Sequence, residues 1–375
     1  MILVDEMVVN EDLTKNILDK YDDIPRKIVK KDHLESLSSP FSLYQGKQIL
    51  FITAQKGELV KPCPGTLPPY LCCRYTVINQ MTQCPINCTY CILQCVFDQP
   101  FISLYTNITD IFRGVDRFLK EQPKRFYRFG TGELTDSLVL DNVTDISSLL
   151  IQFFSQKKNA LIEFKTKTAC VEQLLDSTQQ HAVVSWSLNP QAIVDTDEVG
   201  AARIIDRLYA AKRCQEKGFL LGFHFDPILY VSNWETMYEK LIQQIFSYVD
   251  GSRIAWISLG SLRFPPDLKE IIQRRFPRSR IIYEEMIRGL DGKMRYPKPL
   301  RIEMYQKIYS WLKEQFEGSF IYFCMESPDV WDRVMGKHPW SNEELDFWFA
   351  QSLWERFPEL NMNKPERDTY TASNA

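Results

Sequence analysis

Residues 75–94 read YTVINQMTQCPINCTYCILQ, and this stretch indicates the class of protein. Its first part, Tyr75–Asn79, is rich in β-branched and aromatic residues and predicts a strand. The loop after that strand holds Cys84, Cys88 and Cys91 within eight residues. Such spacing is too tight for a disulfide framework and is typical of a metal site.

Three thiolates in a C-x3-C-x2-C loop favour an iron–sulfur cluster. They can bind three of its four irons and leave the fourth open for an exogenous ligand. Zinc is the alternative, although a structural zinc site requires four protein ligands. Cys95 either supplies that fourth ligand or packs one helical turn beyond Cys91.

Strand-like runs alternate with amphipathic helical stretches after residue 75. The predicted strands are Tyr75–Asn79, Phe126–Phe129, Leu161–Thr166, Ala182–Leu188, Phe219–Phe225 and Arg253–Leu259. The predicted helices are Ile108–Glu121, Val143–Gln156, Ala201–Lys217 and Trp234–Tyr248. This alternation predicts an α/β fold with a parallel sheet, either doubly wound or an open partial barrel. In both cases the site lies at the C-terminal ends of the strands.

The flanking segments are less regular. A strand is predicted at Ile49–Thr53, a helix at Pro266–Arg275, and a capping box at Ser341 and Glu344 that opens the last helix. We expect an N-terminal extension over 1–70, a barrel core over 71–262, a C-terminal substrate or lid region over 263–362, and a disordered polar tail over 363–375.

The composition excludes several classes of protein. Of the 375 residues, 45% are apolar and 25% are charged, which excludes a disordered or low-complexity chain. The net charge of −3 excludes a uniformly basic nucleic-acid coat. The sequence contains no long uncharged apolar run and no basic segment before a short apolar start. We therefore expect a cytoplasmic, monomeric protein with no membrane span.

Charge is uneven along the chain. Residues 253–301 hold twelve lysines and arginines against five acids, with Phe264, Phe276, Tyr283 and Tyr296 interleaved. Such a segment is able to follow a phosphate backbone and stack on bases. A solvated helical face is the alternative interpretation.

The cysteine loop, with Tyr90 before its third cysteine, resembles the signature of radical S-adenosylmethionine enzymes. Across roughly residues 45–325 the chain resembles the spore photoproduct lyase branch of that superfamily. The matching segments are CTYCILQ (88–94), RFGTGELTD (128–136), FKTK (164–167), WSLN (186–189), KGFLLGFHFDPI (217–228) and LRFPPDLKEIIQRRFP (262–277).

This resemblance implies an open partial (β/α)6 parallel barrel with N-terminal and C-terminal extensions. It also implies a [4Fe–4S] cluster, S-adenosylmethionine as cofactor, and an electron donor such as flavodoxin or ferredoxin. It assigns Cys84, Cys88 and Cys91 to the cluster and Tyr90 to the adenine.

The resemblance further implies a set of cofactor contacts at strand ends. Gly130, Gly132 and Glu133 form a G-x-G-E turn similar to the superfamily's G-G-E, in which the acid takes the methionine ammonium. Contacts to the cofactor's carboxylate and ribose are implied for Thr135, Lys167, Ser187 and Asn189. Glycines permit close approach, and a lysine pairs with a carboxylate. Ordinary turn chemistry accounts for each of these residues when it is taken singly.

Two positions depart from the family pattern. The cysteine that returns a hydrogen atom to the product radical in the family is Glu133 here, and the tyrosine after the third cluster cysteine is Ile92. Repair of the thymine dimer by that route is therefore not expected. Cys95 is our first candidate for a replacement hydrogen donor, and packing is the alternative role for any free cysteine.

The fifth predicted strand carries polar residues where the family has apolar ones. His224 and Asp226 lie on one face of that strand by alternation. We expect them, with Glu133, to be catalytic or substrate-binding groups that orient a polar substrate or move a proton. A satisfied buried His–Asp pair is the alternative, and Arg263 is expected to contact an anion.

Together these observations predict a radical S-adenosylmethionine enzyme that abstracts hydrogen from a nucleic-acid-related substrate. Radical modification of a peptide or small molecule is the first alternative. A metal-binding protein that binds nucleic acid without catalysis is the second.

Overall fold

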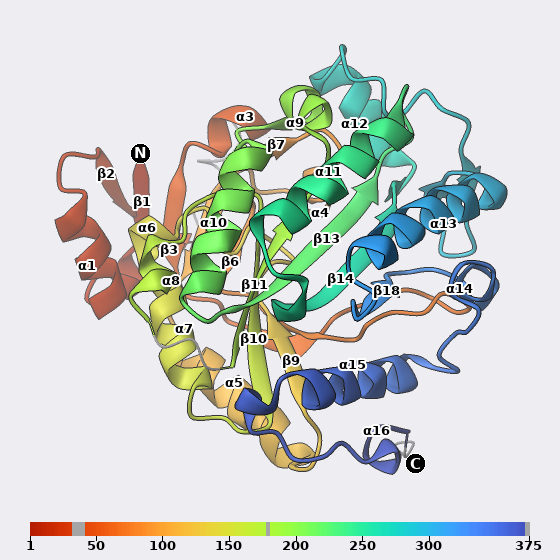
Figure 1. The fold of residues 1–375 in the computed structure, drawn as a ribbon. Helices are drawn as coiled ribbons and strands as arrows, with labels where there is room; N and C mark the ends of the chain where they lie inside the picture. Colours follow the sequence, from red (N-terminus) through yellow and green to blue (C-terminus); the bar gives the residue numbers. More distant parts are fainter. Residues whose placement is uncertain (32–41, 178–180, 372–375) are drawn as a thin grey trace.

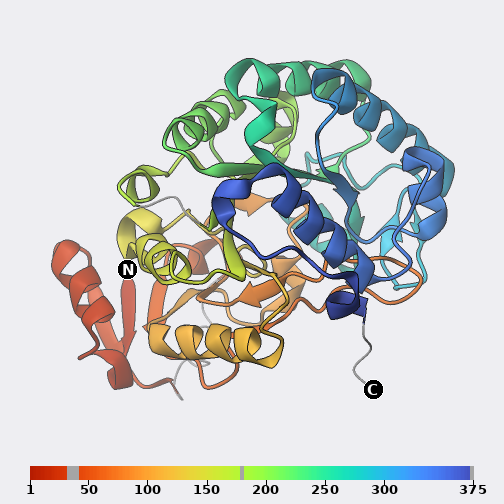
Figure 2. The same cartoon turned by 60° about the horizontal axis from the view of Figure 1, so that its bottom comes forward.

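The computed structural model describes residues 1–31, 42–177 and 181–371. Its main sheet has the strand order β18-β14-β13-β11-β10-β9-β5-β4. The strands are β4 (Val60–Pro62), β5 (Thr76–Ile78), β9 (Tyr127–Gly130), β10 (Ala160–Thr166), β11 (Ala182–Ser187), β13 (Leu220–Ile228), β14 (Ile254–Ser261) and β18 (Ile321–Phe323). Figure 1 and Figure 2 show this sheet curled, with helices around its outside.

The α/β partial barrel predicted from the sequence is confirmed. All six predicted strands occur in chain order and pair in parallel. β18 adds a further parallel strand at one edge, and β4 pairs antiparallel at the other. The strands read as nearly continuous apolar runs because both faces of the sheet are covered.

The helices that cover the outer face are α5 (Ile108–Glu121), α6 (Asp141–Thr144), α7 (Ile146–Phe154), α8 (Glu172–Leu175), α10 (Ile204–Glu216), α11 (Trp234–Tyr248) and α13 (Lys298–Gln315). α9 (Gln191–Asp197) lies instead at the top of Figure 1. The predicted helix 143–156 is divided at Asp145, which has a φ of 51°. Asp141 accepts hydrogen bonds from the backbone and the hydroxyl of Ser147, and these cap the start of α7.

A second sheet, with the order β2-β1-β3-β8-β6, lies beside the barrel. Its elements are β1 (Ile2–Asp5), α1 (Asp12–Lys20), β2 (Arg26–Val29), α3 (Leu43–Gly46), β3 (Leu50–Thr53), β6 (Met81–Thr82) and β8 (Ile102–Tyr105). β6 and β8 pair antiparallel, and the cysteine loop, residues 83–101, runs between them. This loop contains β7 (Asn87–Cys88) and α4 (Leu93–Val96).

The C-terminal part adds a small antiparallel sheet and several helices. These elements are β15 (Arg263–Phe264), α12 (Asp267–Arg275), β16 (Ile287–Arg288), β17 (Met294–Arg295), α14 (Pro328–Met335), α15 (Asn342–Arg356) and α16 (Arg367–Thr371). Ser341 Oγ accepts from the Glu344 N–H at 3.2 Å as predicted, but Glu344 Oε2 accepts from the N–H of Trp340 rather than Ser341.

The expectation of a disordered tail was wrong for residues 363–371, which include α16. Tyr370 is buried, and its hydroxyl accepts a hydrogen bond of 3.0 Å from the N–H of Phe126. Tyr370 and the ion pair between Arg367 and Glu344 therefore attach this polar segment to the core and to α15. Residues 372–375 lie outside the described part of the chain. In the described residues, no helix is long and apolar enough to cross a membrane.

Candidate active site

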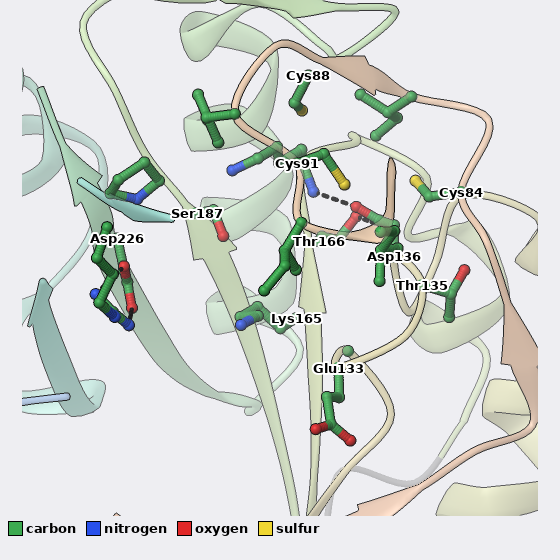
Figure 3. Close-up of a pocket in the computed structure, with 18 of the residues that line it drawn as sticks. Cys84, Cys88, Cys91, Glu133, Thr135, Asp136, Lys165, Thr166, Ser187 and Asp226 are labelled. Atoms are coloured by element: carbon green, nitrogen blue, oxygen red, sulfur yellow. Dashed lines mark hydrogen bonds and ion pairs between the residues drawn. The ribbon is translucent and has the colours of Figure 1, made fainter. Parts of the chain in front are cut away.

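A cavity of about 320 Å³ lies at the C-terminal ends of the barrel strands. Sequence-predicted residues that line it are Cys84, Cys88, Tyr90, Cys91, Gly132, Glu133, Thr135, Lys167, Ser187, Asp226 and Arg263. Figure 3 shows the three cysteines at one end of the view, Glu133 at the opposite end and Asp226 to the side. Four predicted residues do not line this cavity: Cys95, Gly130, Asn189 and His224.

The cysteine loop is fixed by its own side chains and by one short strand pair. β7 pairs antiparallel with β12 (Glu198–Val199). Gln94 Nε2 donates to the carbonyls of Cys88 (3.3 Å), Thr89 (2.9 Å) and Cys91 (3.1 Å), which curls the segment between the second and third cysteines. These contacts hold the three thiols on one side of the cavity.

Burial raises the pKa of Cys84 to about 12 and raises the pKa of Cys88 well above its usual range. Without a metal these cysteines are therefore neutral thiols, and a bound metal would reverse that preference because its charge stabilises thiolates. In the described part of the chain, no three histidine, cysteine or acidic side chains are arranged to hold a metal ion as they stand. The soft donor set nevertheless matches an iron–sulfur cluster.

Glu198, which the sequence analysis missed, is the centre of a buried network beneath the cavity. It accepts hydrogen bonds from Tyr90 Oη, from Asn189 Nδ2 at 3.0 Å and from Arg207 Nη2 at 2.7 Å. Lys167 Nζ lies 3.5 Å from Glu198 Oε1. Burial alone would raise the pKa of Glu198, but Lys167 and Arg207 outweigh burial and lower it to about 2.

This network explains why Asn189 does not line the cavity. Its amide nitrogen donates to Glu198, and its Oδ1 accepts from Tyr238 Oη at 2.6 Å. The side chain therefore orients other residues, and the prediction that Asn189 contacts a ligand has no geometric support. Lys167 and Ser187 do line the cavity.

The turn after β9 carries the predicted G-x-G-E residues. Asp136, also missed from sequence, orders this turn by accepting from the Lys167 N–H (2.6 Å), Thr166 Oγ1 (2.7 Å) and the Leu138 N–H (3.0 Å). Gly130 lies against the ring of Tyr75. The small size of this residue therefore makes room for a tyrosine side chain and not for a cofactor.

Two buried polar atoms in the cavity wall have no hydrogen-bond partner among the described residues. They are Glu133 Oε2 and Thr135 Oγ1. Burial raises the pKa of Glu133, while Lys61 and Lys165 lower it. Unpaired buried polar atoms are costly, so this pair indicates that a polar ligand belongs in the cavity.

His224 lies in a smaller adjoining cavity of about 50 Å³ that shares Gly132, Lys165 and Asp226 with the first. Its Nε2 lies 2.7 Å from Oε1 of Glu163. The same oxygen accepts from Ser185 Oγ at 2.5 Å and from Trp256 Nε1 at 3.0 Å. Burial would raise the pKa of Glu163, but His224, the hydrogen bond from Ser185 and the charge of Lys165 together lower it to about 2.

Asp226 and His224 both line this smaller cavity, as strand alternation predicts, but they do not form the His–Asp pair that was the alternative interpretation. Asp226 instead binds Arg263 through two hydrogen bonds of 3.0 Å each. Arg263 is therefore already neutralised by a carboxylate, which weakens its predicted role as an anion contact. Lys165, between the two cavities, has no ion pair in the described part of the chain.

The position of Cys95 does not support its predicted role as a hydrogen-atom donor. It lies on the outer side of the one-turn helix α4 and is exposed, whereas Leu93 and Gln94 of that helix are buried. Cys73 and Cys324 are the thiols that line the smaller cavity.

Comparisons with known proteins extend these observations. The family model described as spore photoproduct lyase matches residues 72–324. Curated spore photoproduct lyases from Geobacillus sp. (strain Y412MC61) and Bacillus subtilis (strain 168) are each 27% identical over 208 residues, covering 54% of this chain. The chain spans 61% of the length of these relatives.

Solved structures of spore photoproduct lyase variants share the fold. One variant, with bound AdoMet and dinucleoside spore photoproduct, has a TM-score of 0.76 and 23% identity. Another has a TM-score of 0.77 and 22% identity. Each likeness covers 86% of this chain and 98% of the solved one.

Proposed function

This chain belongs to the spore photoproduct lyase family, and on that premise we propose that it is a radical S-adenosylmethionine enzyme. The observation that carries the proposal is that three cysteine thiols and two unpartnered buried oxygens line one cavity. Cysteine thiolates are the ligands of iron–sulfur clusters, and the two oxygens would form hydrogen bonds with a polar cofactor. When bound, a reduced [4Fe–4S] cluster supplies the electron that cleaves S-adenosylmethionine to a 5′-deoxyadenosyl radical.

The protein's own residues would bind and orient the cofactor. Cys84, Cys88 and Cys91 would hold three irons, and Tyr90 would lie against the adenine. Glu133 and Thr135 would form hydrogen bonds with the methionine end of the cofactor. Glu133 Oε2 and Thr135 Oγ1, which lack a partner among the described residues, would then each have one. Lys167 would pair with the cofactor's carboxylate, while Glu198 keeps that lysine in place.

The smaller cavity would receive part of the substrate. The Glu163–His224 pair is buried, and Glu163 Oε1 is bound by His224 Nε2, Ser185 Oγ and Trp256 Nε1, so the imidazole ring of His224 is fixed in one orientation in the cavity wall. The Asp226–Arg263 pair would form the adjoining wall. No thiol stands at Glu133, which favours a second candidate function, radical modification of a peptide or small molecule.

We propose a nucleic-acid-related substrate as the first candidate, with contacts through part of residues 253–301. Six of the twelve cations form ion pairs, in which Lys293 and Arg295 share Asp291; the six are Arg253, Arg263, Lys293, Arg295, Lys298 and Arg301. Phe264 and Tyr296 are buried and unable to stack on bases, whereas Tyr283 is 61% exposed. Phosphate contacts are therefore expected from the exposed cations of 269–288.

Anaerobic reconstitution tests the proposal. We expect about four irons per chain and release of 5′-deoxyadenosine after reduction with S-adenosylmethionine present. Cys84→Ala, Cys88→Ala and Cys91→Ala should each remove the cluster. Stoichiometric zinc that is stable to oxygen, with no 5′-deoxyadenosine, would instead support a non-catalytic metal protein.

A further inference from the structure

Two cationic side chains lie against the cysteine loop from distant parts of the chain. Lys47 Nζ donates to the carbonyl of Ile86 at 2.8 Å and to Asn87 Oδ1 at 3.4 Å. Arg275 donates to the same Asn87 Oδ1 at 2.9 Å and also to Gln94 Oε1. Asn87, which lies between the first and second cysteines of the loop, therefore joins both cations.

Local structure fixes the position of Lys47. Ser42 and Gln45 form a capping box that starts α3, and Lys47 directly follows this helix. Gly46 approaches Pro100 so closely that an added Cβ would lie 2.3 Å from the proline side chain. Since Pro100 ends the cysteine loop, this contact places Lys47 beside the loop and leaves it 7% exposed.

α12 fixes the position of Arg275 by packing against α4. Ser279, just after α12, donates to Asp197 Oδ1 at 2.6 Å, and Thr89 of the cysteine loop donates to the same oxygen at 2.8 Å. The end of α12 is therefore tied to the loop on two sides.

Neither cation forms an ion pair with a carboxylate in the described part of the chain. The side-chain hydrogen bonds of Lys47 and Arg275 go to a backbone carbonyl and to amide oxygens, which are neutral. Burial lowers the pKa of Lys47 and nearby Arg275 adds to that change, whereas negative charge on Cys91, Cys84 and Cys88 raises it. A cation so placed is favourable only beside negative charge. A cluster held by three thiolates supplies such charge, and one-electron reduction makes it more negative.

We propose that Lys47 and Arg275 are positioning residues for the iron–sulfur cluster, and that their charges stabilise its reduced state relative to its oxidised state. This inference rests on the proposed function. Lys47 lies outside the region 72–324 that matches the family model, whereas Arg275 lies inside it. Outer-shell groups and net charge are known determinants of cluster potential.

The test is a redox titration of the reconstituted protein without substrate, in which the reduced cluster is followed by electron paramagnetic resonance. Lys47→Gln retains a hydrogen-bond donor for the Ile86 carbonyl and removes the charge. Arg275→Gln likewise removes the charge and retains a donor for Asn87 Oδ1. At a fixed solution potential we expect each variant to show an about tenfold lower ratio of reduced to oxidised cluster, which corresponds to about 59 mV. Lys47→Arg should restore the wild-type ratio.

Arg333→Gln is the matched control, because Arg333 is an exposed cation on α14 whose partner is Asp329. Ratios in Lys47→Gln and Arg275→Gln equal to that control, at full iron content, would overturn the inference. If Lys47→Gln takes up no iron, the iron content of Lys47→Arg decides the question. Full iron content in Lys47→Arg would support the inference, and an equal loss of iron in Lys47→Arg would overturn it. A wild-type protein that takes up no iron would instead refute the proposed function.

Discussion

Replacing Glu198 by glutamine tests the network that supports the candidate cofactor site. The pKa of Glu198 is lowered from 4.5 to about 2, a difference of roughly 2.5 units. At about 1.36 kcal/mol per unit, the charged form stabilises the folded state by roughly 3 kcal/mol. The variant also leaves Arg207 buried without a counter-ion. We therefore expect the free energy of unfolding at pH 7 to fall by roughly 3 kcal/mol.

The same pKa sets the pH dependence. Because the folded-state pKa lies below the unfolded value, the stabilisation is fully present above about pH 4.5. It is lost as the pH falls from about 4.5 towards 2, where Glu198 becomes protonated in the folded state as well. The difference in stability between wild type and Glu198→Gln should therefore shrink across that range.

Urea unfolding followed by tryptophan fluorescence measures both effects. Glu172→Gln is the matched control, because the Glu172–Arg213 pair has a similar distance of 2.7 Å but side chains 62% and 34% exposed. Exposed pairs contribute about 1 kcal/mol or less, so the control should lose little. An equal decrease in the free energy of unfolding in the two variants at pH 7 would show that the buried Glu198 network stabilises the protein no more than an exposed ion pair does.

Three further predictions concern the cluster, the chemistry and the substrate. Cys95→Ala should keep the full iron content, since Cys95 is exposed outside the cavity; loss of iron would make it a fourth ligand. The wild type should not give repeated clean turnover of dinucleoside spore photoproduct, because Glu133 has no weak S–H bond to donate; chromatography of the products decides this, and repeated clean turnover would contradict it. Arg274→Gln/Arg278→Gln should lower the slope of log affinity against log salt for single-stranded DNA by about 1.4, as expected for two lost phosphate contacts, and an unchanged slope would exclude this segment as the binding surface.

Much of the barrel was predictable because its strands are buried on both faces and read as apolar runs. Trp234–Tyr248 was predicted to the residue, since its apolar residues recur at helical spacing. The cysteine loop was predictable because three cysteines within eight residues are typical of a metal site. Its strand partner β12 was not, since two residues at the end of α9 carry no periodic signal.

The supporting acids were harder to predict. Asp136, Glu163 and Glu198 lie in turns, inside a strand or after a helix, and nothing local distinguishes them from surface acids. Their roles follow from hydrogen-bond donors that other parts of the chain supply, such as Arg207 for Glu198 and His224 Nε2 for Glu163. For the same reason the sequence placed His224 and Asp226 on one face without revealing that their partners are Glu163 and Arg263, because alternation gives the shared face but not the partner.

The hairpin formed by β6 and β8 has a consequence for how the cysteine loop gains a metal. This hairpin holds the two ends of residues 83–101 together, so the entropy of closing the loop is lost when the N-terminal sheet folds. A cluster bound by the loop would then depend on that sheet for its affinity. By thermodynamic reciprocity, the cluster would stabilise the sheet in return. Hydrogen exchange at β1, β3 and β8 would therefore slow when iron is loaded, and opening of the N-terminal sheet would release the cluster while the barrel stays folded.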